Sequence, residues 1–123
     1  MPPLDHAHPI DADALAQARA GILTRGEAER LTKLLGVLAD PVRSRLLFAL
    51  VSVDELCVGD LSLALGDVTD DQTSYALKQL RGAGLVQTRR DGRIMNYRLA
   101  DGFPHQLLEH CLRELLTITE GSR

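Results

Sequence analysis

Residues 69–99 read TDDQTSYALKQLRGAGLVQTRRDGRIMNYRL, a stretch that combines a capped polar helix with a hairpin. Thr69 and Gln72 form the capping-box pattern that opens a helix, and a pair of glycines ends that helix a dozen residues later. Two strand-like runs, residues 85–90 and 94–99, then flank an Asp-Gly turn signal. The stretch therefore predicts a polar helix followed by a two-stranded hairpin.

Further helices are expected on both sides of this stretch. Thr24 and Glu27 form a second capping-box pattern, and the helix that they open must end before Pro41, because proline disfavours helix at the preceding residue. Apolar residues recur at helical spacing in the remaining segments. The expected helices span residues 24–38, 41–51, 58–65, 70–81 and 104–118. We predict a flexible arm over residues 1–12 and a single domain over residues 13–123.

Composition narrows the possible classes of protein. The 123 residues are enough for one domain with a modest core. No apolar run approaches the roughly 18 residues that span a bilayer, and the N-terminus lacks the basic start and apolar stretch of a signal peptide. We expect a cytoplasmic protein with no membrane partner. The formal net charge of -3 argues against indiscriminate binding to nucleic acid, so any DNA binding requires a local basic patch.

The order of the predicted elements, short helices followed by a hairpin, is that of a winged helix-turn-helix. We expect a mainly α structure with a small β-hairpin wing, an α+β fold. Four segments make the expectation more specific. LADPVRSRLL at residues 38–47 and ELCVGDL at residues 55–61 resemble a characteristic segment and the metal box of ArsR/SmtB repressors. SYALKQLRGAGLV at residues 74–86 is similar to the recognition helix of these repressors, and residues 89–97 are similar to their wing.

The resemblance to the ArsR/SmtB family covers about residues 31–118. It implies a homodimeric transcriptional repressor, built on its first and last helices, that binds double-stranded operator DNA and releases it when a metal ion binds. No catalytic arrangement of residues is present, and an enzyme is not expected. A winged-helix module that binds only proteins is the alternative from a different class.

The DNA-binding surface is expected on the polar helix and on the hairpin. Side chains that reach base edges and phosphates from one face are needed there. The candidates are Gln72, Thr73, Ser74, Tyr75, Lys78, Gln79, Arg89, Arg90 and Arg93. Asp70 and Asp71 oppose this interpretation, since acids in the first helical turn repel a nearby phosphate. The alternative is an ordinary solvated hairpin with exposed arginines.

The resemblance implies that a metal site joins the cysteine of the metal box to the N-terminal arm. Cys57 offers a thiolate and Asp60 a carboxylate, while His6 and His8 of the arm offer imidazoles. This mixed set suits a tetrahedral divalent ion, with zinc preferred and cobalt or cadmium as alternatives. The opposite interpretation is that Cys57 is a small buried apolar residue and that the two histidines belong to a disordered terminus.

The resemblance also implies a second metal site at the last helix, but Phe103 and Thr117 stand in this sequence where two of the usual ligands of ArsR/SmtB repressors would be. The replacement candidates are Asp101, His105, His110 and Glu114, against an ordinary polar helix face. A redox switch between Cys57 and Cys111 is a further alternative, which requires Cα atoms within about 7 Å. Simple packing is the other interpretation of Cys111.

Overall fold

The computed structural model describes residues 7–121, apart from the side chains of residues 105 and 121. The chain divides into two compact units between Lys33 and Leu34. In the first unit, α1 (Ala12–Gly21) begins after Asp11, whose carboxylate accepts a hydrogen bond from the backbone N–H of Ala14 at 3.0 Å. This helix was not predicted, because Leu15 is its only large apolar residue and no apolar stripe marks it. The division into an arm and a domain after residue 12 stays a prediction.

The next two helices are both capped at their N-termini, and the capping box predicted for the first of them is confirmed. The helix α2 (Arg25–Leu38) begins with a capping box: the backbone N–H of Thr24 donates to Glu27 at 2.9 Å, and that of Glu27 donates to the Thr24 hydroxyl at 3.1 Å. The helix α3 (Pro41–Val51) has proline in its first turn, and Asp40 caps it by accepting from the backbone N–H of the third helical residue at 2.9 Å.

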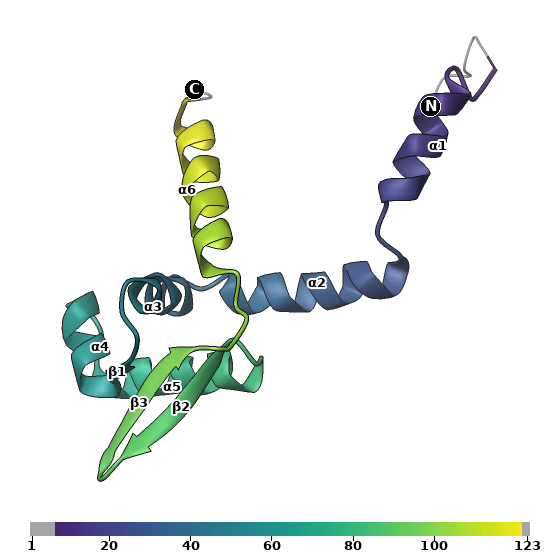
Figure 1. Cartoon of the computed structure of the whole chain (residues 1–123). Helices are drawn as coiled ribbons and strands as arrows, with labels where there is room; N and C mark the ends of the chain where they lie inside the picture. Colours follow the sequence, from purple (N-terminus) through teal and green to yellow (C-terminus); the bar gives the residue numbers. More distant parts are fainter. Residues whose placement is uncertain (1–6, 122–123) are drawn as a thin grey trace. The chain divides into compact units, whose positions relative to one another are not determined.

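The second unit contains the helix-turn-helix and its core (Figure 1). The helices α3, α4 (Val58–Leu65) and α5 (Asp70–Gly82) pack on one another and on the base of a small sheet. Their apolar faces bury a cluster of leucines with a valine and a tyrosine from the sheet. The largest fully buried side chains are Leu46, Leu50, Leu61, Leu77 and Leu80. The predicted bounds of α4 are confirmed, and α5 is one residue longer than predicted.

The sheet has three strands within the described residues. The hairpin strands β2 (Val86–Asp91) and β3 (Ile94–Leu99) are antiparallel and confirm the predicted wing. The short β1 (Leu56–Cys57) pairs with the other edge of β3, which gives the order β1-β3-β2. The strand β1 was not predicted, because two residues are too few to show an alternating pattern. The sheet therefore joins the start of α4 directly to the wing.

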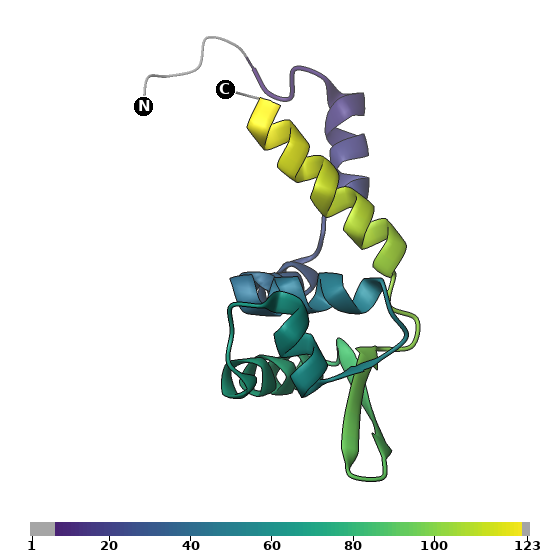
Figure 2. The same cartoon turned by 90° about the vertical axis from the view of Figure 1, so that its left-hand side faces the viewer.

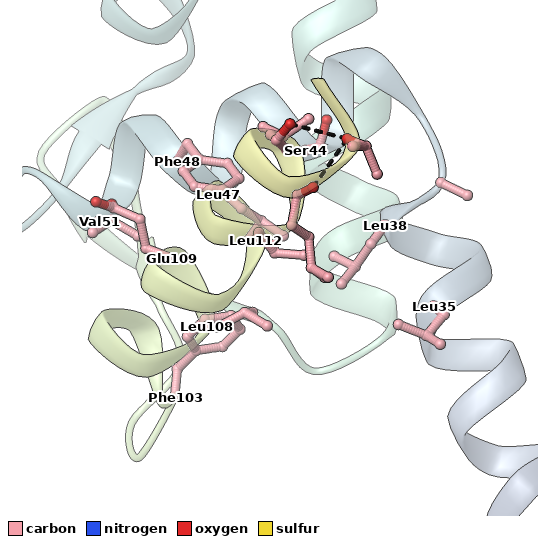
Figure 3. A pocket seen from close by; sticks show the side chains of 14 residues that line it. Leu35, Leu38, Ser44, Leu47, Phe48, Val51, Phe103, Leu108, Glu109 and Leu112 are labelled. Atoms are coloured by element: carbon pink, nitrogen blue, oxygen red, sulfur yellow. Dashed lines mark hydrogen bonds between the residues drawn. The ribbon is translucent and has the colours of Figure 1, made fainter. Parts of the chain in front are cut away.

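The last helix, α6 (His105–Gly121), leaves the body on the side opposite to the tip of the wing (Figures 1 and 2). It contacts α3, where the guanidinium of Arg113 lies 5.0 Å from the centre of the Phe48 ring. Between α3 and α6 is an apolar pocket of about 460 Å³, and Figure 3 shows side chains of both helices, such as Phe48 and Leu112, along it. No helix in the described part of the chain is both long and apolar enough to cross a membrane.

Candidate nucleic-acid interface and sensing sites

The helix α5 divides into a buried face and a solvent-facing face. Ala76, Leu77 and Leu80 are buried at helical spacing in the core. On the opposite side, Tyr75 is 67% exposed, and Lys78 is exposed next to it. An exposed aromatic ring beside an ammonium group is a surface that can contact a base edge and a phosphate. Tyr75 and Lys78 are thus the helix candidates whose side chains are most accessible to DNA.

One predicted DNA contact, Thr73, is a core residue instead. Its side chain is fully buried. Its hydroxyl donates to the carbonyl oxygen of Thr69 at 3.0 Å and accepts from the Ser62 hydroxyl at 2.8 Å. The position lies in the middle of the buried face of α5, so the polar side chain is retained by hydrogen bonds rather than by solvent. The prediction for Thr73 is therefore corrected: this side chain is closed off from any ligand.

Two other candidates on the helix already have partners inside the protein. The side chain of Gln72 accepts from the backbone N–H of Thr69 at 2.9 Å, which completes the capping box of α5. Gln79 is half-buried, and its side-chain oxygen accepts from Arg43 of α3 at 2.8 Å. Ser74 is half-buried on the other flank of the helix. The side chains of Gln72 and Gln79 are thus held by hydrogen bonds within the protein, beside the exposed side chains of Tyr75 and Lys78.

The wing carries the positive charge that the chain as a whole lacks. Arg90 and Arg93 are exposed near the tip of the hairpin, and within residues 7–121 neither makes an ion pair. Arg89 differs, because both carboxylate oxygens of Glu55 accept from its guanidinium, at 3.0 and 3.1 Å from Nε. The hydrogen bond donated by Arg89 holds the pKa of Glu55 below the usual carboxyl value. Two of the three predicted arginines are therefore available to phosphates.

Two further arginines belong to this surface and were not predicted. A groove of about 540 Å³ lies between the end of α5 and the wing, and Arg81, Arg89 and Arg98 line it. Arg98 pairs with Asp101 at 2.9 Å. A signal for Arg81 was present in the sequence, since it follows Lys78 by three residues and so lies on an adjacent strip of the same helix. Of the arginines in this groove, Arg89 and Arg98 are paired with carboxylates, and Arg81 makes no ion pair within the described residues, so Arg81 adds available positive charge at the end of α5.

We predict that Glu55→Gln strengthens DNA binding and makes it more dependent on salt. The substitution removes a negative charge beside Arg89 and releases its guanidinium for a phosphate. The pKa of Glu55 is lowered in the folded protein, so its contribution to stability is complete above the ordinary carboxyl range and is lost as pH falls through the lowered value. Urea denaturation should show a constant difference in stability between the wild type and Glu55→Gln from pH 7 down to about pH 5, and a loss of wild-type stability relative to the variant as pH falls below the ordinary carboxyl value.

A matched control for this prediction is Asp91→Asn. Asp91 lies 3.9 Å from Arg89 and makes a longer and more exposed ion pair than Glu55 does. This control should change the salt dependence of DNA affinity less than Glu55→Gln does. It should also change the pH dependence of stability less. Equal effects of the two variants would show that general charge, rather than the Glu55 pair, determines the result.

At the first predicted metal site, the structure brings together two of the residues. Cys57 is half-buried at the N-cap of α4, and Asp60 is exposed in the first turn of the same helix. His8 lies in the other compact unit, and His6 lies outside the described residues. No group of three or more His, Cys, Asp or Glu side chains that could hold a metal is found within residues 7–121. Among the described residues, Cys57 and Asp60 are therefore not joined by a third candidate ligand.

The second predicted set is dispersed. Asp101 is engaged with Arg98, and the side chain of His105 lies outside the described part of the structure. His110 and Glu114 are exposed one turn apart on α6. Cys57 and Cys111 are both free thiols, the second of them exposed. The second metal site is not assembled among the side chains that the structure describes, and the redox pair stays a prediction.

Comparison with known proteins identifies the family. The model of the bacterial regulatory protein arsR family matches residues 40–88. The transcriptional repressor SmtB homolog of Synechocystis is 36% identical over 92 residues, which are 75% of this chain and 68% of that protein. The chain belongs to the ArsR/SmtB family. The family consists of DNA-binding transcriptional regulators and not of enzymes, which confirms the resemblance seen in the sequence.

Two solved structures of ArsR/SmtB type add to this finding. The antimony-specific transcriptional repressor AntR is 31% identical with a TM-score of 0.68, and the match covers 80% of this chain and 88% of that one. A homodimeric winged helix-turn-helix DNA-binding domain from Mycobacterium bovis is 26% identical with a TM-score of 0.62, covering 82% and 92%. The winged helix-turn-helix prediction is confirmed by these neighbours. Relatives of this chain respond to metals or metalloids, namely antimony, arsenic and cadmium.

Proposed function

We propose that this chain is a homodimeric repressor that binds operator DNA through α5 and the wing and releases it when a divalent metal ion binds at Cys57. The pairing of β1 with β3 is the observation that carries the proposal. In this register Cys57 is opposite Asn96, and Asn96 is in turn opposite Arg89 on β2. A ligand that displaces the Cys57 backbone therefore acts on the wing through two hydrogen-bonded strands.

The donor atoms at this place suit a metal ion of intermediate softness. Cys57 supplies sulfur and Asp60 supplies oxygen at the start of one helix. Two imidazoles from His6 and His8 would complete a tetrahedral set that binds zinc, cobalt or cadmium. The two histidines are proposed as ligands from their donor chemistry and from the resemblance of residues 55–61 to the family's metal box. Bound metal would supply the free energy that shifts the wing.

The proposed dimer uses the exposed apolar surface of α6. Four large apolar side chains of this helix are more than half exposed, which is costly unless another surface covers them. They are Leu107, Leu115, Leu116 and Ile118. The homodimeric neighbour of the same family supports a second copy as the cover. A cytoplasmic location, where thiols stay reduced, is part of the proposal.

The proposal is tested by titrating the reduced protein with cobalt, zinc and cadmium while recording absorbance and release of a DNA duplex. We expect tetrahedral cobalt bands, a thiolate charge-transfer band, and DNA affinity that falls about 5- to 150-fold on metal binding. The variant Cys57→Ser should lose the charge-transfer band and the release while it keeps the metal-free affinity. The matched control Cys111→Ser should behave like the wild type.

Other outcomes separate the alternatives. Release that depends on both cysteines and on an oxidant, and not on metal, would replace the metal sensor by the thiol switch. Metal binding that survives Cys57→Ser but not His110→Ala would move the site to α6. Absence of salt-sensitive DNA binding by the wild type would contradict the repressor and favour the protein-interaction module.

A further inference from the structure

Arg43 connects three helices of the second unit. It stands in the first turn of α3, and its guanidinium reaches both neighbours. Nε donates to the carbonyl oxygen of Val37, and Nη2 lies 3.4 Å from that of Gly36, both at the end of α2. On the other side, Nη1 donates to the side-chain oxygen of Gln79 in α5 at 2.8 Å. One half-buried cation thus joins the end of α2 to the recognition helix.

The contact with α2 satisfies the carbonyl oxygen of Val37, whereas that of Gly36 also accepts from the backbone N–H of Ala39 at 3.3 Å. The last carbonyl groups of an α-helix have no partner within it and carry the negative end of its dipole. The last turn of α2 contains no basic residue of its own. The guanidinium of Arg43 fills this role from the following helix, and its planar fork allows donation in two directions at once. A lysine ammonium has the charge but lacks this geometry.

The contact with α5 fixes the position of the exposed face of this helix, which carries Tyr75 and Lys78. Gln79 follows Lys78 directly and lies one helical turn after Tyr75, so it borders the exposed surface described above. Its hydrogen bond with Arg43 limits rotation of α5 about its own axis relative to α3. A hydrogen bond with a charged donor in a half-buried position is stronger than one between neutral groups in water. Sequence spacing predicted Gln79 as a direct DNA contact, whereas its partner in the structure indicates another role.

We propose that Arg43 and Gln79 are positioning residues for DNA recognition: they hold α5 in the orientation that presents Tyr75 and Lys78, and Arg43 itself contacts no phosphate. This inference rests on the proposed DNA binding by α5. Without the hydrogen bond between Arg43 and Gln79, α5 can adopt a wider range of orientations relative to α3. Affinity for a specific duplex falls because base contacts depend on position, while affinity for random DNA is kept because phosphate neutralisation depends on charge.

The test is a double-mutant cycle with Arg43→Lys and Gln79→Met, using a duplex selected from a random library by the wild-type protein and a random duplex of equal length. Each single variant should bind the selected duplex about tenfold more weakly, the scale of one hydrogen bond to a charged group. The double variant should bind no more weakly than either single variant. Random-duplex affinity and the salt dependence of binding should remain those of the wild type.

The control is Arg45→Lys, two residues along α3. Arg45 donates to Asp67 at 2.7 Å and to the carbonyl oxygen of Leu65 at 2.8 Å, which fastens the turn before α5 and not α5 itself. Melting temperatures of all variants show whether a loss of affinity merely follows a loss of stability. Additive losses, a reduced salt dependence of binding when the charge is removed in Arg43→Gln, or an equal loss in Arg45→Lys would overturn the inference. A wild type that binds neither duplex would instead refute the proposed function.

Discussion

The double variant Arg90→Ala, Arg93→Ala is expected to bind DNA at least about tenfold more weakly than the wild type at moderate salt, with no change in fold. Both side chains are exposed near the wing tip and make no ion pair within the described residues, so their charge is available to phosphates. A homodimer loses four such charges. The logarithmic salt dependence of the affinity should therefore become shallower by about 3 to 4 units. Fluorescence anisotropy of a labelled duplex at several salt concentrations measures both quantities.

A control of equal charge distinguishes the wing from net charge. Arg19 and Arg30 are exposed residues of the first unit, and Arg19→Ala, Arg30→Ala changes the net charge by the same amount. This control should leave the salt dependence close to that of the wild type. A wing variant that behaves like the control would show that the hairpin is an ordinary solvated one, as the alternative interpretation of the sequence holds.

The variant Thr73→Val is expected to destabilise the protein by about 1–3 kcal/mol in the free energy of unfolding, while the folded protein keeps its DNA affinity. Valine has nearly the same shape as threonine but cannot accept the hydrogen bond from Ser62. The Ser62 hydroxyl, on a residue only 8% exposed, would lose its 2.8 Å partner with little access to water. Urea denaturation monitored by circular dichroism gives the change in stability.

Ser74→Ala is the control for Thr73→Val. Ser74 is the next residue of α5 but lies on a half-buried flank outside the core. Its substitution should change stability by less than about 0.5 kcal/mol. If Thr73→Val unfolds like the wild type but binds DNA more weakly, Thr73 contacts DNA after all, and α5 must then open to expose it.

Local patterns in the sequence determined most of the helices and strands from α2 onward. Capping boxes at Thr24 and Thr69 begin α2 and α5 where they were predicted, because a cap involves residues only three apart in the chain. The Asp-Gly signal correctly predicted the hairpin of the wing, because a tight turn also involves only neighbouring residues. In this turn Gly92 adopts a φ of 62°. The α1 helix shows the limit of such patterns, since a segment with one large apolar residue has no stripe to detect.

Tertiary structure alone decided which polar residues remain available for binding. Thr73 and Tyr75 look alike as polar members of one helix, yet packing on α4 buries the first and leaves the second exposed. The partners Glu55 and Arg89 are 34 residues apart, and Arg43 and Gln79 are 36 apart. No local rule predicts such pairs, because they form only when helices and strands that are remote in sequence pack together. The sequence determined the elements and their chemistry, and packing selected which of those groups face one another and which face solvent.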